Sequence, residues 1–143
     1  LAGVTLVVLS LLPTVVFYFS MYYLGSPVGV IDSGAVAMSF LGLIMLGASF
    51  VAIGIFSSTI TSNQIVAFIF AMFLCWFAFS GLSLLGSYAT FAGLDSVIRY
   101  ASLDYHYDSI KKGVLIFSDV VYFSGVIFFF LFASHNVLTA IRK

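Results

Sequence analysis

The side chains with chemistry to offer gather in one short stretch, Asp104-Tyr105-His106-Tyr107-Asp108. In an extended segment Asp104, His106 and Asp108 would share one face, because side chains alternate along extended backbone. One imidazole and two carboxylates could then hold a divalent metal ion. The competing interpretation is a solvated interfacial turn that binds no metal, and the sequence favours this second one.

Other candidates for chemistry lack partners. His135 and Asn136 lie near the end of the last apolar run. A proton relay through them would need a partner acid or base inside the membrane, and the apolar runs contain none. Cys75 is the single cysteine, so it has neither a disulfide partner nor metal-ligand spacing. No activated nucleophile and no phosphate-binding glycine loop occurs. We therefore predict no catalytic, cofactor-binding or metal residue in this chain, and no enzyme activity of its own.

The composition is that of a membrane protein. Of the 143 residues, 63% are hydrophobic and 7% are charged, against about 25% charged in a typical soluble domain. Charges are missing from three long stretches, residues 1–31, 33–94 and 120–141. A membrane span needs roughly 20 apolar residues, so these stretches hold one, two and one spans. Nucleic acid is excluded as a partner because the chain has no basic face.

The predicted fold is an all-α membrane protein, a single transmembrane domain over residues 1–143. We place its spans at about residues 3–24, 34–56, 65–85 and 119–138. Pro13 predicts a kink in the first span, and the polar residues 57–64 predict a short loop after the second. Small residues let membrane helices approach closely, and the second span is rich in them: Gly42, Gly47, Ala48, Ala52 and Gly54.

The segment of residues 86–118 differs from the rest of the chain. It holds most of the charges and four tyrosines, and it is too long for a bare loop. We expect one or two short amphipathic helices there, lying in the membrane interface or dipping back into the bilayer.

The terminal Arg142-Lys143 pair predicts a cytoplasmic C-terminus by the positive-inside rule. With four spans, all eight tyrosines then map to the opposite, outer side. Such one-sided enrichment indicates either an aromatic collar around an outer vestibule or an outer cap packed on the spans.

Two passages resemble a known family. Ala52-Ile53-Gly54, Phe56-Ser57-Ser58, Thr61 and Asn63-Gln64-Ile65-Val66-Ala67 are similar to a loop passage in the membrane subunits of type-2 ABC exporters. A second group of residues in this chain resembles the outer segment that leads into the last span of those subunits: His106, Ser109, Lys112, Gly113, Asp119 and Tyr122. The pattern looks closest to the gliding-motility-associated GldF-like permeases.

The resemblance implies a six-span permease of the bacterial inner membrane, of which this chain is the last four spans. It implies three partners: a separate cytoplasmic ABC ATPase, a second permease copy or paralogue, and the surrounding lipid bilayer. It makes Ser58, Thr61, Asn63 and Gln64 candidate cytoplasmic-loop contacts. The alternative is that Ser57, Ser58, Thr61 and Asn63 cap two helix ends. The alternative function is a non-transporting scaffold subunit of a motility or secretion complex. A carrier or channel is disfavoured because the spans hold no charge apart from Asp119, which lies at the N-terminus of the fourth.

Overall fold

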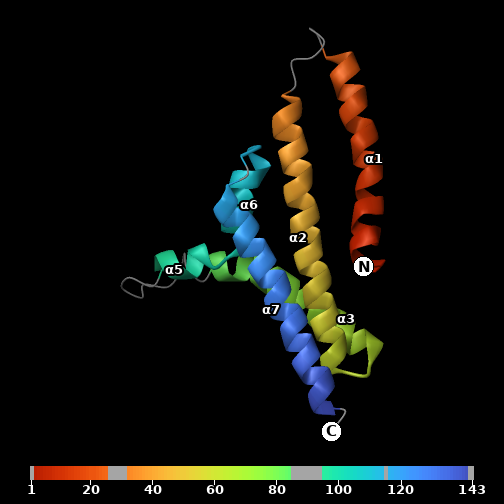
Figure 1. Cartoon of the computed structure of the whole chain (residues 1–143), viewed down its shortest axis with the longest axis vertical. Coiled ribbons are helices and arrows are strands. Elements are labelled where there is room, and N and C mark those ends of the chain that lie inside the picture. The colour runs from red at the N-terminus through yellow and green to blue at the C-terminus, as the bar shows by residue number, and fades with distance from the viewer. Residues whose placement is uncertain (1, 26–31, 85–94, 115, 142–143) are drawn as a thin grey trace.

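The computed structural model describes residues 2–25, 32–84, 95–114 and 116–141, and this part of the chain is helical throughout, with short connections (Figure 1). Four helices are long and apolar enough to cross a membrane, in agreement with the four predicted spans. They are α1 (Ala2–Leu24), α2 (Ser33–Ile60), a third helix over Gln64–Leu84, and α7 (Phe117–Ile141). The third helix comprises α3 (Gln64–Trp76) and a π-helical turn, η1 (Phe77–Gly81).

The expected short helices between the third and fourth spans are also present. They are α5 (Asp95–Tyr100) and α6 (Leu103–Lys111), and α5 lies across the direction of the long helices in Figure 1. In α6 the buried residues Leu103, His106 and Ile110 recur at helical spacing, so the helix has one inward face and one polar face.

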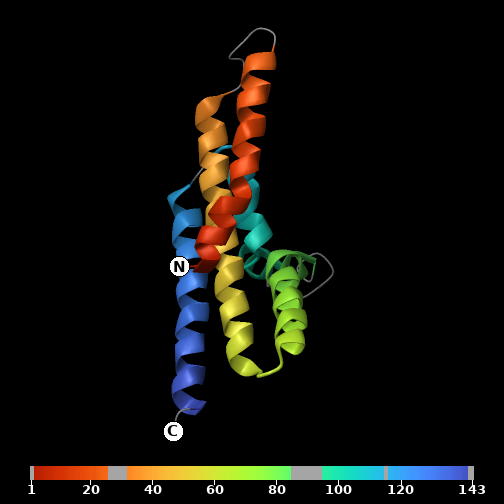
Figure 2. The same ribbon diagram turned by 90° about the vertical axis from the view of Figure 1, so that its right-hand side faces the viewer.

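The central helix is α2, which contacts α1, α3, α6 and α7 (Figures 1 and 2). It packs antiparallel to α1, and a glycine on each helix allows close contact at two successive turns: a Cβ on Gly3 would lie 2.6 Å from Val51, and one on Gly47 would lie 2.5 Å from Val7. On the α7 side the rings of Phe56 and Phe130 meet edge to face at 5.6 Å. Most side chains of α1 and α3 point away from these contacts, as lipid-facing helices do.

The tightest glycine contact in the described chain joins α2 to α6. A Cβ on Gly42 would lie 1.8 Å from the Cγ2 atom of Ile110, so only glycine allows this contact. One turn further on, Gly113 has φ +78° and lies against Ala35, where a Cβ would come within 2.8 Å of backbone. Ser39 Oγ lies 3.2 Å from the Ile110 carbonyl oxygen and donates to it or to its own helix. Glycine at two positions therefore sets the depth at which α6 packs.

The helix α2 extends four residues beyond the predicted end at residue 56. Hydroxyl groups explain the difference, because Ser57 Oγ donates to the Ile53 carbonyl and Thr59 Oγ1 to that of Phe56. Ser58 accordingly lies in the last turns of a helix and not in a loop, and the connection shrinks to residues 61–63. The predicted capping role holds for Asn63, whose side chain accepts from the Ile65 amide at 3.0 Å.

Some expectations lie outside the described residues. These are the first inter-helix turn at residues 26–31, the start of the outer segment at residues 85–94, and the Arg142-Lys143 pair. The helix α1 continues through Pro13, and a kink there stays a prediction.

The Gly42–Ile110 contact yields a prediction. Gly42→Ala should destabilise the fold by about 1–3 kcal/mol, because the added methyl group overlaps Ile110. Combining it with Ile110→Ala should cost clearly less than the sum of the two single changes, because the smaller side chain makes room. Thermal unfolding in detergent measures both effects.

The matched control is Gly54→Ala on the same helix. No atom lies within 4 Å of the Cβ position at Gly54, so this change should be neutral or stabilising by up to about 1 kcal/mol through helix propensity. Equal losses at Gly42 and Gly54, or strictly additive losses at Gly42 and Ile110, would contradict the packing described.

Candidate functional site

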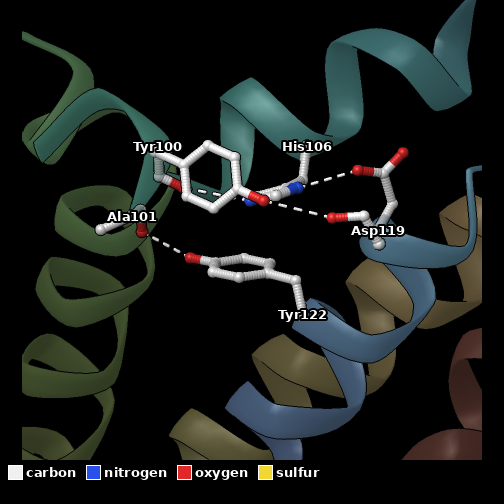
Figure 3. A network of polar contacts seen from close by, with 6 residues as sticks. Tyr100, Ala101, His106, Asp119 and Tyr122 are labelled. Carbon is white, nitrogen blue, oxygen red and sulfur yellow. Dashed lines mark hydrogen bonds and ion pairs between the residues drawn. The ribbon is translucent and has the colours of Figure 1, made fainter. Parts of the chain in front are cut away.

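A buried polar pair joins α6 to the start of α7. His106 is 2% exposed and Asp119 4%, and their Nδ1 and Oδ1 atoms are 2.8 Å apart (Figure 3). The sequence positions both: His106 belongs to the inward face of α6, and Asp119 lies in the first turn of α7, where a negative charge suits the helix dipole. The pair therefore fastens the outer helices to the fourth span.

The contact of the second ring nitrogen of His106 determines how many hydrogens the His106–Asp119 pair carries. Its Nε2 atom lies 3.0 Å from the carbonyl oxygen of Tyr100, at the end of α5. A carbonyl can only accept, so Nε2 carries a hydrogen and donates it. A second hydrogen must lie between Nδ1 and Asp119 Oδ1. The pair is then either imidazolium with carboxylate or imidazole with carboxylic acid, and both forms have zero net charge. Because the pair has no net charge, the free energy needed to bury it is lower than for a single charged group.

Aromatic rings enclose the imidazole. The ring of Tyr122, one turn after Asp119, stacks on His106 with centroids 3.9 Å apart and planes 19° apart. Tyr100 meets the imidazole edge to face at 4.7 Å, and its hydroxyl is 3.2 Å from that of Ser118. The Tyr122 hydroxyl donates to the carbonyl of Ala101. Both tyrosines thus combine a ring contact with a polar contact, although Tyr100 is half exposed and Tyr122 is partly buried.

A third contact fastens the outer helices to η1. Ser102 is fully buried, and its hydroxyl donates to the carbonyl of Phe79 at 2.7 Å. The π-helical register of residues 77–81 interrupts the α-helical hydrogen-bond ladder, and Ser102 satisfies a carbonyl within it. Ser102 occupies the N-cap position of α6, but it makes no side-chain cap because its hydroxyl is used here.

The opposite face of α6 is solvated and charged. Asp108 is bracketed by two ammonium groups, with Lys111 Nζ 2.6 Å from Oδ1 and Lys112 Nζ 2.6 Å from Oδ2. Hydrogen bonds from Lys111 and Lys112 lower the pKa of Asp108 to about 2, and the bond with Asp108 raises the pKa of Lys111. Just beyond, Gly113 ends the helix in the left-handed conformation, and its amide donates to the Ile110 carbonyl at 2.8 Å.

The structure brings together the outer-segment residues named from the sequence. His106, Asp119 and Tyr122 form one network, and Gly113 lies in the turn after α6. In that turn the carbonyl of Ser109 accepts from the amides of Lys112 and Val114. Thr61 and Asn63 lie in the connection after the other end of α2, near Ser58, and Gln64 is the first residue of α3.

The metal interpretation of residues 104–108 is wrong. The segment is helical, so residues two apart point to different sides, and His106 is buried while Asp108 faces the lysines. Across the described ranges no group of three metal-ligating side chains occurs. His135 and Asn136 lie exposed near the end of α7.

Tyr100 and Ser102 take part in the site although the sequence did not single them out. Tyr100 binds the imidazole through its carbonyl, which every residue has, so this bond leaves no signal in the residue type, although its ring also contacts His106. Ser102 meets a carbonyl exposed by a π turn that no local pattern predicted. The pairing of His106 with Asp119 had a signal, since both belong to the outer motif, but their contact depends on the turn between α6 and α7.

The His106–Asp119 pair should behave as a unit in stability measurements. His106→Leu leaves the Asp119 carboxyl buried without its partner and should cost about 3–5 kcal/mol. Asp119→Leu leaves Nδ1 of the ring unpaired and should cost about 1–3 kcal/mol. The double variant should cost much less than the sum, because both members are then apolar. Thermal unfolding in detergent would give the three values.

Tyr105→Phe serves as the control, because Tyr105 neighbours His106 on the chain and is half exposed. Its effect should be small and should add simply to that of His106→Leu. Additive losses in the His106 and Asp119 variants would contradict the buried pair.

Comparisons with known proteins leave the chain without an assigned family. Neither a scan against protein-family models nor searches of the curated proteins and the solved structures find a match. Its function is therefore inferred from the residues and geometry described above.

Proposed function

We propose that this chain is a membrane-spanning permease subunit of an ATP-driven exporter of the ABC class, set in the bacterial inner membrane with its C-terminus in the cytoplasm. The observation that carries the proposal is the outer helix pair. The helices α5 and α6 stand between the third and fourth spans and fold back against them, held by the same motif residues on which the family resemblance rests.

The distribution of charge supports an external source of energy. The first three spans contain no charged side chain, and the described part of the fourth has only Asp119, which is neutralised by His106. A carrier driven by an ion gradient needs intramembrane groups that bind the ion. A chain without such ion-binding groups suits transport driven by ATP hydrolysis on a partner subunit. A second permease copy would complete the transport pathway.

The packing also suits rigid-body movement. Because α6 is fixed to α2, η1 and α7 at once, a displacement of these helices carries the outer pair with it. The apolar exteriors of α1 and α3 leave those helices free to face lipid or a partner chain. Export for gliding motility is the process that the resemblance suggests, and the substrate class stays open.

The first test concerns ATP. The protein expressed from its native gene and purified alone should hydrolyse no ATP, and activity should appear only with a cytoplasmic ATPase subunit encoded nearby. The control is that ATPase with its phosphate-binding lysine replaced, which should form the complex and hydrolyse nothing. Turnover by the purified protein alone would overturn the proposal. A stable complex that hydrolyses ATP without moving any substrate would favour the scaffold alternative.

The second test concerns orientation, with cysteine labelling of intact cells in a Cys75→Ala background. Val114→Cys, in the exposed turn between α6 and α7, should react with a membrane-impermeant maleimide added outside. Ser62→Cys, in the exposed connection between α2 and α3, should react only after permeabilisation. The reverse pattern would overturn the cytoplasmic placement of the C-terminus.

A further inference from the structure

A groove of about 360 Å³ runs between α1 and α6, with α2 as its floor. Val36, Phe40 and Leu43 of α2 form this apolar floor, and Thr14 of α1 lines one side. Lys111 and Lys112 stand at the α6 side. Figure 1 shows α1 and α6 flanking α2, one on each side, and residues of all three helices line the groove. The volume is at the lower end of the roughly 300–1,000 Å³ typical of ligand sites, so it suits part of a lipid.

The charge at this groove is positive. Two ammonium groups bracket one carboxylate, so Asp108, Lys111 and Lys112 together have a net charge of +1. The lysine side chains are 50% and 67% exposed, which leaves their remaining N–H donors accessible. The pKa of Asp108, lowered to about 2 by its lysine partners, keeps this charge constant across the physiological range.

The lysines are not needed to complete the end of α6. A helix C-terminus leaves carbonyls that basic side chains often satisfy. Here the Gly113 turn does so, since the amides of Lys112 and Val114 donate to Ser109 and that of Gly113 to Ile110. The ammonium groups at the groove are therefore available to a ligand once they release Asp108.

We propose that this groove binds an anionic phospholipid from the bilayer, with an acyl chain along Val36, Phe40 and Leu43 and the phosphate at Lys111 and Lys112. An apolar floor joined to a cationic edge on a membrane helix bundle is complementary to an amphiphile with a negative head group. The site does not depend on the transport function proposed above, because it would hold lipid whether the chain serves as a permease or as a scaffold.

The test is titration of the detergent-solubilised protein with short-chain phosphatidylglycerol and, separately, with short-chain phosphatidylcholine, followed by the change in thermal stability. The anionic lipid should bind more tightly. Lys111→Gln with Lys112→Gln should remove that preference, weakening phosphatidylglycerol binding by about fivefold to twentyfold, since each basic group near a membrane surface contributes modestly. Binding of phosphatidylcholine should not change.

Asp108→Asn should change lipid binding in the opposite direction. It releases both ammonium groups and should tighten phosphatidylglycerol binding. Asp104→Asn changes the net charge by the same amount four residues earlier on α6, but Asp108 and not Asp104 forms the ion pairs with Lys111 and Lys112, so its effect on binding should be clearly smaller. Equal effects of the two variants would show attraction by net charge alone and would overturn the site.

The apolar floor is tested by blocking it. Thr14→Trp should fill the groove and weaken binding, whereas Ser10→Trp, one turn away on the same face of α1 and outside the groove lining, should not. Inorganic phosphate alone should compete poorly, because it lacks the chain. If phosphate competes as well as the lipid, or if Thr14→Trp has no effect, the acyl-chain site is wrong. Unchanged unfolding of each lipid-free variant confirms that the fold is intact.

Discussion

The packing of α5 and α6 on the start of α7 depends on one constraint: two ionisable side chains are buried, and they must neutralise each other. His106 and Asp119 do this at 2.8 Å, and the Tyr100 carbonyl takes the remaining ring hydrogen. Each hydrogen bond comes from a different element, so the requirement to satisfy the imidazole fixes α5, α6 and α7 relative to one another. Tyr122 then covers the ring and ties the same elements through Ala101.

A second constraint is steric, and it depends on two glycines that have no side chain. Gly42 admits Ile110 to the surface of α2, and Gly113 turns the chain against Ala35 with a positive φ. The buried pair sets which way α6 faces, and the glycines set how near it comes. Larger residues at either glycine would push α6 outward and, with it, lengthen the bond from His106 to Asp119.

The helical part of the fold could be predicted because lipid imposes it: apolar runs of sufficient length must be helices. The same logic predicted short amphipathic helices in the outer segment. It could not predict that Ser57 and Thr59 would continue α2, because hydroxyl groups can either end a helix or bond back to it. Nor could it show that His106 meets Asp119 and not its neighbours Asp104 and Asp108. That choice follows from tertiary packing and from helical rotation, which turns His106 inward and the carboxylates outward.

The division of α6 into two faces relates the site to the groove. Residues at helical spacing, Leu103, His106 and Ile110, are buried, while Asp108 and the two lysines stay in the solvent-facing cluster. The inner face must hold zero net charge to be buried at all, and the outer face can keep a charge because it is hydrated. A ligand at Lys111 and Lys112 would therefore act on a helix whose other side is rigidly fixed to α2, η1 and α7. Binding there would restrain the bundle as a whole, since α6 cannot shift alone without breaking the His106–Asp119 pair.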